Sequence, residues 1–138
     1  MDDWSAGEVP TNLAAAPGPD YPHGQCTEFA ARTVRERTGF AGFYFPRAPG
    51  DPPRHAKSWP MLATAAGIAS GSTPRVNAVA VFTDGIFATW GHVAVVTDVY
   101  GDQSFDVIES NWPRPLTVGT RSHLRPETVT TFLYPTAE

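Results

Sequence analysis

The chain has 138 residues, which is enough for one domain with a hydrophobic core and too short for two. Its formal net charge is −4, with 10 basic residues against 14 acidic ones, so no basic face is expected and nucleic acid is not expected as a partner. The 14 prolines and 12 glycines predict a compact, β-rich body with long irregular connections.

Cys26 is the single cysteine, so an internal disulfide is impossible and the redox compartment cannot be read from bridges. No run of about 18 apolar residues is present, and no membrane span is expected. The acidic start Met1–Trp4 lacks the basic and apolar regions of a signal peptide. This predicts export by a phage-type route, or a trimmed fragment.

Residues 1–20 carry Pro, Gly, Ala and acidic residues without periodicity, and we expect a loose arm there, followed by one domain over residues 21–138. A helix is predicted from about Cys26 to Gly39, a residue suited to a left-handed helix end. Apolar spacing assigns its residues to two faces. The buried face would hold Cys26, Phe29, Ala30, Thr33 and Val34, and the solvent face Arg32, Arg35 and Glu36.

Residues 40–53, rich in Gly, Pro and aromatics, are expected to form a long loop along one wall of a cleft. A second helix is predicted from Ser58 to Ala66, with Ser58 as N-cap, Pro60 in the first turn and Gly67 as the stop. The apolar run Ala78–Phe82 predicts a short buried strand.

Residues 90–112 are typical of a hairpin, because β-branched and aromatic residues flank a Gly-Asp pair. A two-residue turn at Gly101 and Asp102 would set Tyr100 opposite Gln103. Further strands are expected within residues 114–125 and over residues 128–134. A helix followed by antiparallel strands is an α+β order.

Counting outward from that turn places His92 opposite Asn111, on the same strand face as Glu109. Opposed Cβ atoms lie roughly 5 Å apart and diagonal ones roughly 7 to 8 Å, so the three polar groups would be within reach of one another. A slip of one residue would move His92 to the other face.

A histidine beside a carboxylate and an amide is a general base with an orienting partner that lacks a nucleophile, and Cys26 is the cysteine available. At a helix start the dipole favours an ionised thiol. Each residue also has a structural interpretation. Cys26 could be a small core residue, Glu109 a solvated strand-end carboxylate, and Asn111 a turn residue before Trp112 and Pro113.

Three tryptophans, Trp59, Trp90 and Trp112, are candidates for a substrate groove, although a core role is equally open for Trp59. His23, His55 and His123 are assigned to the rim or the surface. No further Cys or His falls at the spacing of a zinc site, so no metal and no other cofactor is expected.

Five segments together resemble the CHAP family, the cysteine- and histidine-dependent amidohydrolases and peptidases of the papain-like and NlpC/P60-like group. In two places the chain departs from the family pattern: Asn77 stands where a glycine is usual, and Pro60 comes early in the second helix. The segments that carry the resemblance are Tyr21–Thr27, Ala56–Trp59, Pro74–Phe82, Gly91–Val96 and Ile108–Trp112.

The resemblance implies a papain-like α+β fold, with N-terminal helices packed on a central antiparallel sheet. It implies Cys26 as nucleophile, His92 as base and acid, Glu109 as orienter and Asn111 as second orienter. The backbone N–H of Cys26 would stabilise the oxyanion, with Gln25 or Tyr21 as candidates for a second donor. Some relatives bind calcium through aspartates ahead of the cysteine; only Asp20 lies there, so calcium is not carried over.

By the same resemblance we expect a monomeric peptidoglycan hydrolase that acts at the bacterial cell wall, as a phage endolysin or a secreted lytic enzyme. The bond would be N-acetylmuramoyl-L-alanine or a link of the stem or cross-bridge peptide. Two alternatives stay open: a wall-binding module without catalysis, and an amidase for small glutathione or polyamine conjugates.

Overall fold

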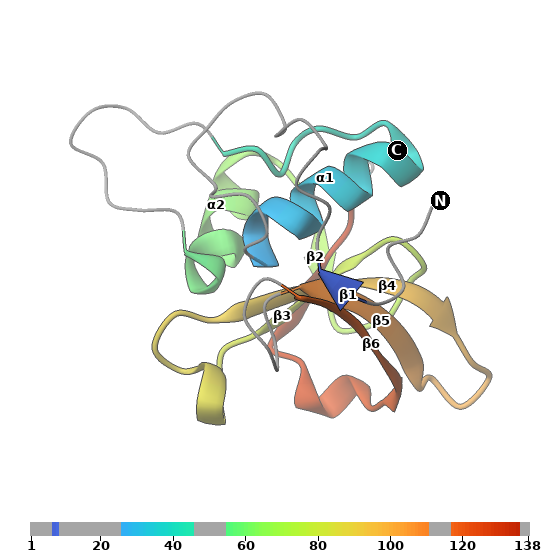
Figure 1. Cartoon of the computed structure of the whole chain (residues 1–138). Helices are drawn as coiled ribbons and strands as arrows, with labels where there is room; N and C mark the ends of the chain where they lie inside the picture. The colour runs from blue at the N-terminus through green and yellow to red at the C-terminus, as the bar shows by residue number, and fades with distance from the viewer. Residues whose placement is uncertain (1–6, 9–25, 46–54, 111–116, 136–138) are drawn as a thin grey trace.

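The computed structural model describes residues 7–8, 26–45, 55–110 and 117–135. Within these ranges a seven-stranded antiparallel sheet, in the order β1-β6-β5-β4-β3-β7-β2, carries α1 (Cys26–Thr38) and α2 (Trp59–Ala65) on one face (Figure 1). This confirms the predicted α+β class. The strands are β1 (Gly7–Glu8), β2 (Ser70–Gly71), β3 (Val79–Phe82), β4 (His92–Val99), β5 (Phe105–Ser110), β6 (Thr117–Leu124) and β7 (Thr131–Leu133).

Both helices end where the sequence predicts. Gly39 follows α1 at φ +84°, and its amide donates to the Arg35 carbonyl at 2.7 Å. Gly67 follows α2 at φ +79°, while Pro60 lies within the first turn of that helix. A left-handed backbone conformation costs the least free energy at glycine, so these two glycines end the helices. Neither helix of the described ranges is long and apolar enough to cross a bilayer.

The central strands of the sheet are buried on both faces. Val79 and Val81 of β3 face the helices together with Val93 and Val95 of β4. On the other face a second apolar cluster includes Ala80 and Ala94, and it extends to residues in or beside the 3₁₀ turns η2 (Gly85–Phe87) and η3 (Pro126–Thr128). A strand covered on both sides needs a continuous apolar run, which explains the sequence of β3.

In the helical layer the structure decides one open alternative, at Trp59, and contradicts one prediction, at Arg32. Trp59 is fully buried and stacks on Phe43 with ring centroids 5.2 Å apart, so it belongs to the core and not to a substrate groove. Arg32 is only 2% exposed, where solvent exposure was expected. Its guanidinium pairs with the buried Glu28 carboxylate at 2.8 Å, one helical turn away, which makes burial of both charges tolerable.

The hairpin of β4 and β5 has a longer tip than predicted. The Tyr100 amide donates to the Ser104 carbonyl, so Tyr100 faces Ser104 and not Gln103. Gln103 has φ +73°, a left-handed conformation that suits a three-residue tip. A bulge between Val96 and Asp98 then adds one residue to β4. Beyond that bulge the pairing returns to the predicted register, with Val96 opposite Val107 and Val95 opposite Ile108.

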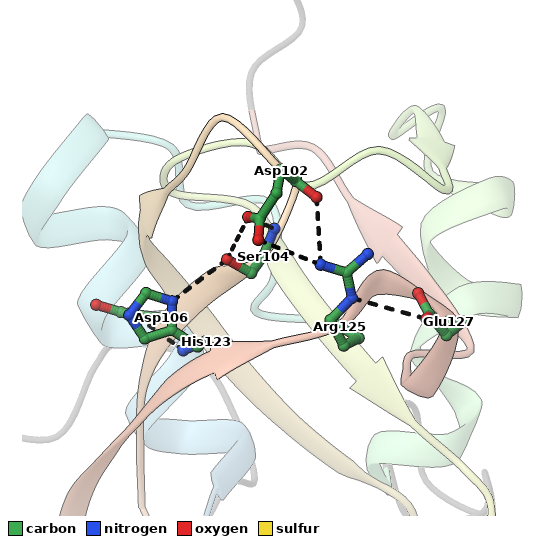
Figure 2. A network of polar contacts seen from close by, with 6 residues as sticks. All are labelled: Asp102, Ser104, Asp106, His123, Arg125 and Glu127. Carbon is green, nitrogen blue, oxygen red and sulfur yellow. Dashed lines mark hydrogen bonds and ion pairs between the residues drawn. The ribbon is translucent and has the colours of Figure 1, made fainter.

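A network of polar side chains lies around the tip of the β4–β5 hairpin, where β4 ends, β5 begins and β6 ends (Figure 2). Asp102 accepts from the Ser104 amide at 2.9 Å and from its hydroxyl at 2.6 Å, which closes the hairpin tip. Asp106 accepts from the His123 amide at 2.9 Å, where β6 also carries a register shift. Arg125 lies 3.5 Å from Asp102 and 3.7 Å from Glu127 in exposed ion pairs. Side chains therefore satisfy backbone groups that the irregular pairing leaves open.

The expected loose arm contributes two residues to the sheet, because Gly7–Glu8 pairs with Val118 and Thr117 of β6. Asn77, the departure from the family pattern, has φ +74°. Its side-chain oxygen accepts from Arg37 Nε at 2.6 Å, which ties the end of α1 to the start of β3. Asparagine tolerates this conformation better than other residues with a side chain, so it can replace glycine here.

Candidate active site

The entry to β4 is held by a close backbone contact at Gly91. Gly91 has φ +77°, and a Cβ placed on it would lie 2.4 Å from the Lys57 amide nitrogen. That amide donates to the Trp90 carbonyl at 2.9 Å, and the Gly91 amide donates to the Phe87 carbonyl at 2.7 Å. Only glycine permits both the conformation and the approach. The backbone immediately before His92 is therefore fixed against the turn η1 (Ala56–Ser58).

His92 is the first residue of β4 and is 3% exposed. Its Nε2 lies 2.7 Å from Glu109 Oε1 on β5, and Glu109 is 1% exposed. The imidazole also stacks on Phe87, with centroids 4.8 Å apart and planes at 15°. A strand, a carboxylate and an aromatic ring together fix the ring plane of His92.

The Cys26 side chain, at the first residue of α1, is partly exposed and lies close enough to the His92 imidazole to raise the pKa of that ring. Because Nε2 faces Glu109, Nδ1 is the nitrogen left for the thiol. An ionised carboxylate only accepts hydrogen bonds, so the proton on Nε2 is assigned from this network. Nδ1 is then the basic nitrogen of neutral His92 and the one available to the thiol.

Burial and hydrogen bonding oppose each other at both ionisable partners. Burial alone would lower the pKa of His92, but the hydrogen bonds to Cys26 and Glu109 outweigh it and raise the pKa above 6.5. Burial would raise the pKa of Glu109, yet the hydrogen bonds from His92 and Arg121 hold it below 4.5. The arrangement therefore favours a charged imidazolium beside a charged carboxylate.

Arg121 on β6 is the site neighbour that the sequence analysis missed. Its Nε lies 2.6 Å from Glu109 Oε2, and its Nη2 lies 2.7 Å from Oε1. Its Cα register partner is Val107, two residues from Glu109 on the same face of β5. The contact between Arg121 and Glu109 depends on the pairing of β5 with β6, and no local sequence motif predicts that pairing.

The other predicted site residues divide into two groups. Asn111, Trp112, Tyr21 and Gln25 lie outside the described residues. Trp90 is 60% exposed, and its ring packs on His55 at 4.5 Å, so it remains a candidate for a substrate groove. Within the described residues no three His, Cys, Asp or Glu side chains gather as a metal site.

Comparison with known proteins identifies the fold and the family. The CHAP domain family matches residues 16–111. The chain belongs to this family. A protein from Streptococcus mutans serotype c is 37% identical over 92 residues, covering 67% of this chain and 36% of that protein. Endolysin PlyTW from Staphylococcus phage Twort is 52% identical over 42 residues, covering 28% of this chain and 9% of the endolysin.

Solved structures of other proteins share the fold of this CHAP domain. An N-acetylmuramoyl-L-alanine amidase from Staphylococcus aureus superposes with a TM-score of 0.69 at 24% identity, covering 88% of this chain and 33% of the amidase. The wild-type endolysin LysIME-EF1 gives a TM-score of 0.55 at 18% identity, covering 88% of this chain and 58% of the endolysin. The chain spans about a third of the length of the Streptococcus mutans protein and of the amidase.

Proposed function

We propose that this CHAP domain hydrolyses an amide bond of bacterial peptidoglycan, with Cys26 as nucleophile and His92 as general base and acid. The observation that carries the proposal is the grouping of three side chains at the start of β4. His92 Nε2 lies 2.7 Å from Glu109 Oε1, and the Cys26 thiol is near enough to raise the pKa of the same imidazole. The family and the relatives named endolysin and N-acetylmuramoyl-L-alanine amidase support a substrate in the cell wall.

In the proposed reaction the Cys26 thiol gives its proton to His92 Nδ1, and Sγ attacks the amide carbonyl carbon. The tetrahedral oxyanion is stabilised by the Cys26 backbone N–H, which lies at the start of α1 and needs no helical partner. His92 then returns the proton to the leaving nitrogen as the C–N bond breaks. A thioester on Cys26 remains, and the amine departs.

Hydrolysis of the thioester completes the cycle. His92 removes a proton from water, the resulting hydroxide adds to the thioester carbonyl, and the C–S bond breaks. The carboxylic acid leaves and the thiol is restored. Glu109 orients the ring through Nε2 in every step, and the raised pKa of His92 suits a group that must hold a proton between steps.

Two kinds of bond are candidates for hydrolysis: the N-acetylmuramoyl-L-alanine amide and a peptide link of the stem or cross-bridge. Incubation of purified peptidoglycan with the protein, followed by mass spectrometry of the released fragments, distinguishes these products by their new termini. A Cys26→Ala variant is the matched control. Fragment release by that variant, or no release by the wild type, would contradict the proposal; binding to walls without release would favour a non-catalytic module.

A further inference from the structure

The carboxylate of Glu109 has two cationic neighbours in the described structure, and they differ in kind. His92 on β4 approaches Oε1 at 2.7 Å, and Arg121 on β6 approaches both oxygens at 2.6 and 2.7 Å. Cys26 on α1 acts on this carboxylate only through His92. The imidazole loses its charge in part of the proposed cycle, whereas a guanidinium stays charged.

A carboxylate as buried as Glu109, at 1% exposure, is costly unless an opposite charge compensates it. If His92 were its sole partner, every step with a neutral imidazole would leave the carboxylate uncompensated. Glu109 would then take up a proton, and its Oε1 would no longer be a dependable acceptor for Nε2–H. The ring could adopt the other tautomer, with the proton on the nitrogen that faces the thiol.

The Arg121 guanidinium is held in a fixed orientation. It forms a bidentate pair with Glu109 and lies over the Phe82 ring, 5.0 Å from the centroid. Its side chain is 23% exposed and lines a cavity of about 270 Å³ together with Phe87 and Asp84. A planar fork matched to a carboxylate supplies charge and direction together.

We propose that Arg121 is a positioning residue that keeps Glu109 ionised and aimed at His92 Nε2 throughout turnover, so that Nδ1 always faces Cys26 in its basic form. This role rests on the proposed Cys26–His92 hydrolysis. It adds a fourth member to the series, one that acts through Glu109 and His92. The lowered pKa of Glu109 agrees with it.

The test compares Arg121→Gln, Arg121→Lys and, as a matched control, Arg125→Gln, which removes an exposed arginine just beyond the same strand. We expect Arg121→Gln to lower kcat/KM on soluble peptidoglycan fragments roughly 10- to 100-fold. The deficit should grow as pH falls, because Glu109 is protonated at a higher pH once the guanidinium is gone. Arg121→Lys should recover part of the loss, and Arg125→Gln should match the wild type.

A purely structural role would give a deficit that is equal at every pH, with lysine no better than glutamine; that result would overturn the proposal. If Arg121→Gln does not fold, Arg121→Lys still tests the proposal. Lysine keeps the charge but loses the bidentate pair, so we expect intermediate kcat/KM and a small loss of activity at low pH. Wild-type-like behaviour of Arg121→Lys at every pH would also refute the need for the fork.

Nuclear magnetic resonance provides a readout that does not depend on the substrate. In the wild type, the ¹⁵N shifts of His92 should show the Nε2–H tautomer when the ring is neutral. In Arg121→Gln the Glu109 carboxyl should titrate at higher pH and the tautomers should mix. If wild-type protein releases nothing from peptidoglycan while these shifts change as expected, the proposed function fails and the positioning role stands. Unchanged shifts would remove the positioning role alone.

Discussion

Gly91 offers a quantitative test of how tightly the site is built, through the change Gly91→Ala. The new Cβ would lie 2.4 Å from the Lys57 amide nitrogen and 2.7 Å from its Cα. Opening the first contact to an ordinary 3.4 Å requires a backbone shift of about 1 Å. A left-handed alanine costs about 1 kcal/mol, and loss of the hydrogen bond from Lys57 to Trp90 costs about 1 kcal/mol more.

We therefore expect Gly91→Ala to lower the free energy of unfolding by about 2 to 3 kcal/mol, measured by urea denaturation. Because His92 follows directly, the same shift would stretch its 2.7 Å contact with Glu109. A misplacement of about 1 Å reduces turnover roughly 100-fold, measured as fragment release from peptidoglycan.

Two other glycines separate the causes of this effect. Gly67 has φ +79° but open space around a Cβ, so Gly67→Ala should cost about 1 kcal/mol through conformation alone. Gly101 has neither feature, so Gly101→Ala should be close to neutral. If Gly91→Ala were no more destabilising than Gly67→Ala and equally active, the close contact would not position the site.

Three further predictions concern single side chains. Cys26→Ser should abolish hydrolysis while leaving the unfolding free energy nearly unchanged, and full activity of this variant would remove the mechanism. Asn77→Ala should cost about 1 to 2 kcal/mol in thermal unfolding, because it loses the Arg37 contact and places alanine at φ +74°, whereas Asn77→Gly should cost less. Glu109 has a lowered pKa, so its contribution to stability is present above about pH 4.5 and is lost as pH falls through its folded pKa. Glu109→Gln should flatten that acid dependence in denaturation curves, and an unchanged slope would contradict the assignment.

Local patterns were sufficient for the helices and for much of the sheet. Gly39 and Gly67 end helices because glycine adopts φ > 0 without cost, and this is readable from one chain. The hairpin shows how two errors can cancel. The tip was predicted one residue too short, and the bulge after Val96 was not foreseen, yet beyond it the pairing matches the prediction. Turn type and bulges depend on twist and side-chain satisfaction, which composition does not encode.

Ion pairs that involve buried side chains could not be predicted from the sequence. Arg121 reaches Glu109 only after β6 pairs with β5, and nothing near either residue in the chain signals the contact. Arg32 was assigned to solvent by helical periodicity, but its ion pair with Glu28 allows burial. Trp59 was open between groove and core, and stacking on Phe43 decides for the core.

The bulge between Val96 and Asp98 uncouples the far end of the hairpin from the chemistry at its base. In this chain the bulge compensates the extra residue of the tip before the strands reach Val95 and Ile108, so the three-residue tip at residues 101–103 does not turn His92 away from Glu109. The tip is thus a natural place for loop exchange, for attaching a fluorophore, or for fusing a wall-targeting peptide without disturbing the thiol and imidazole.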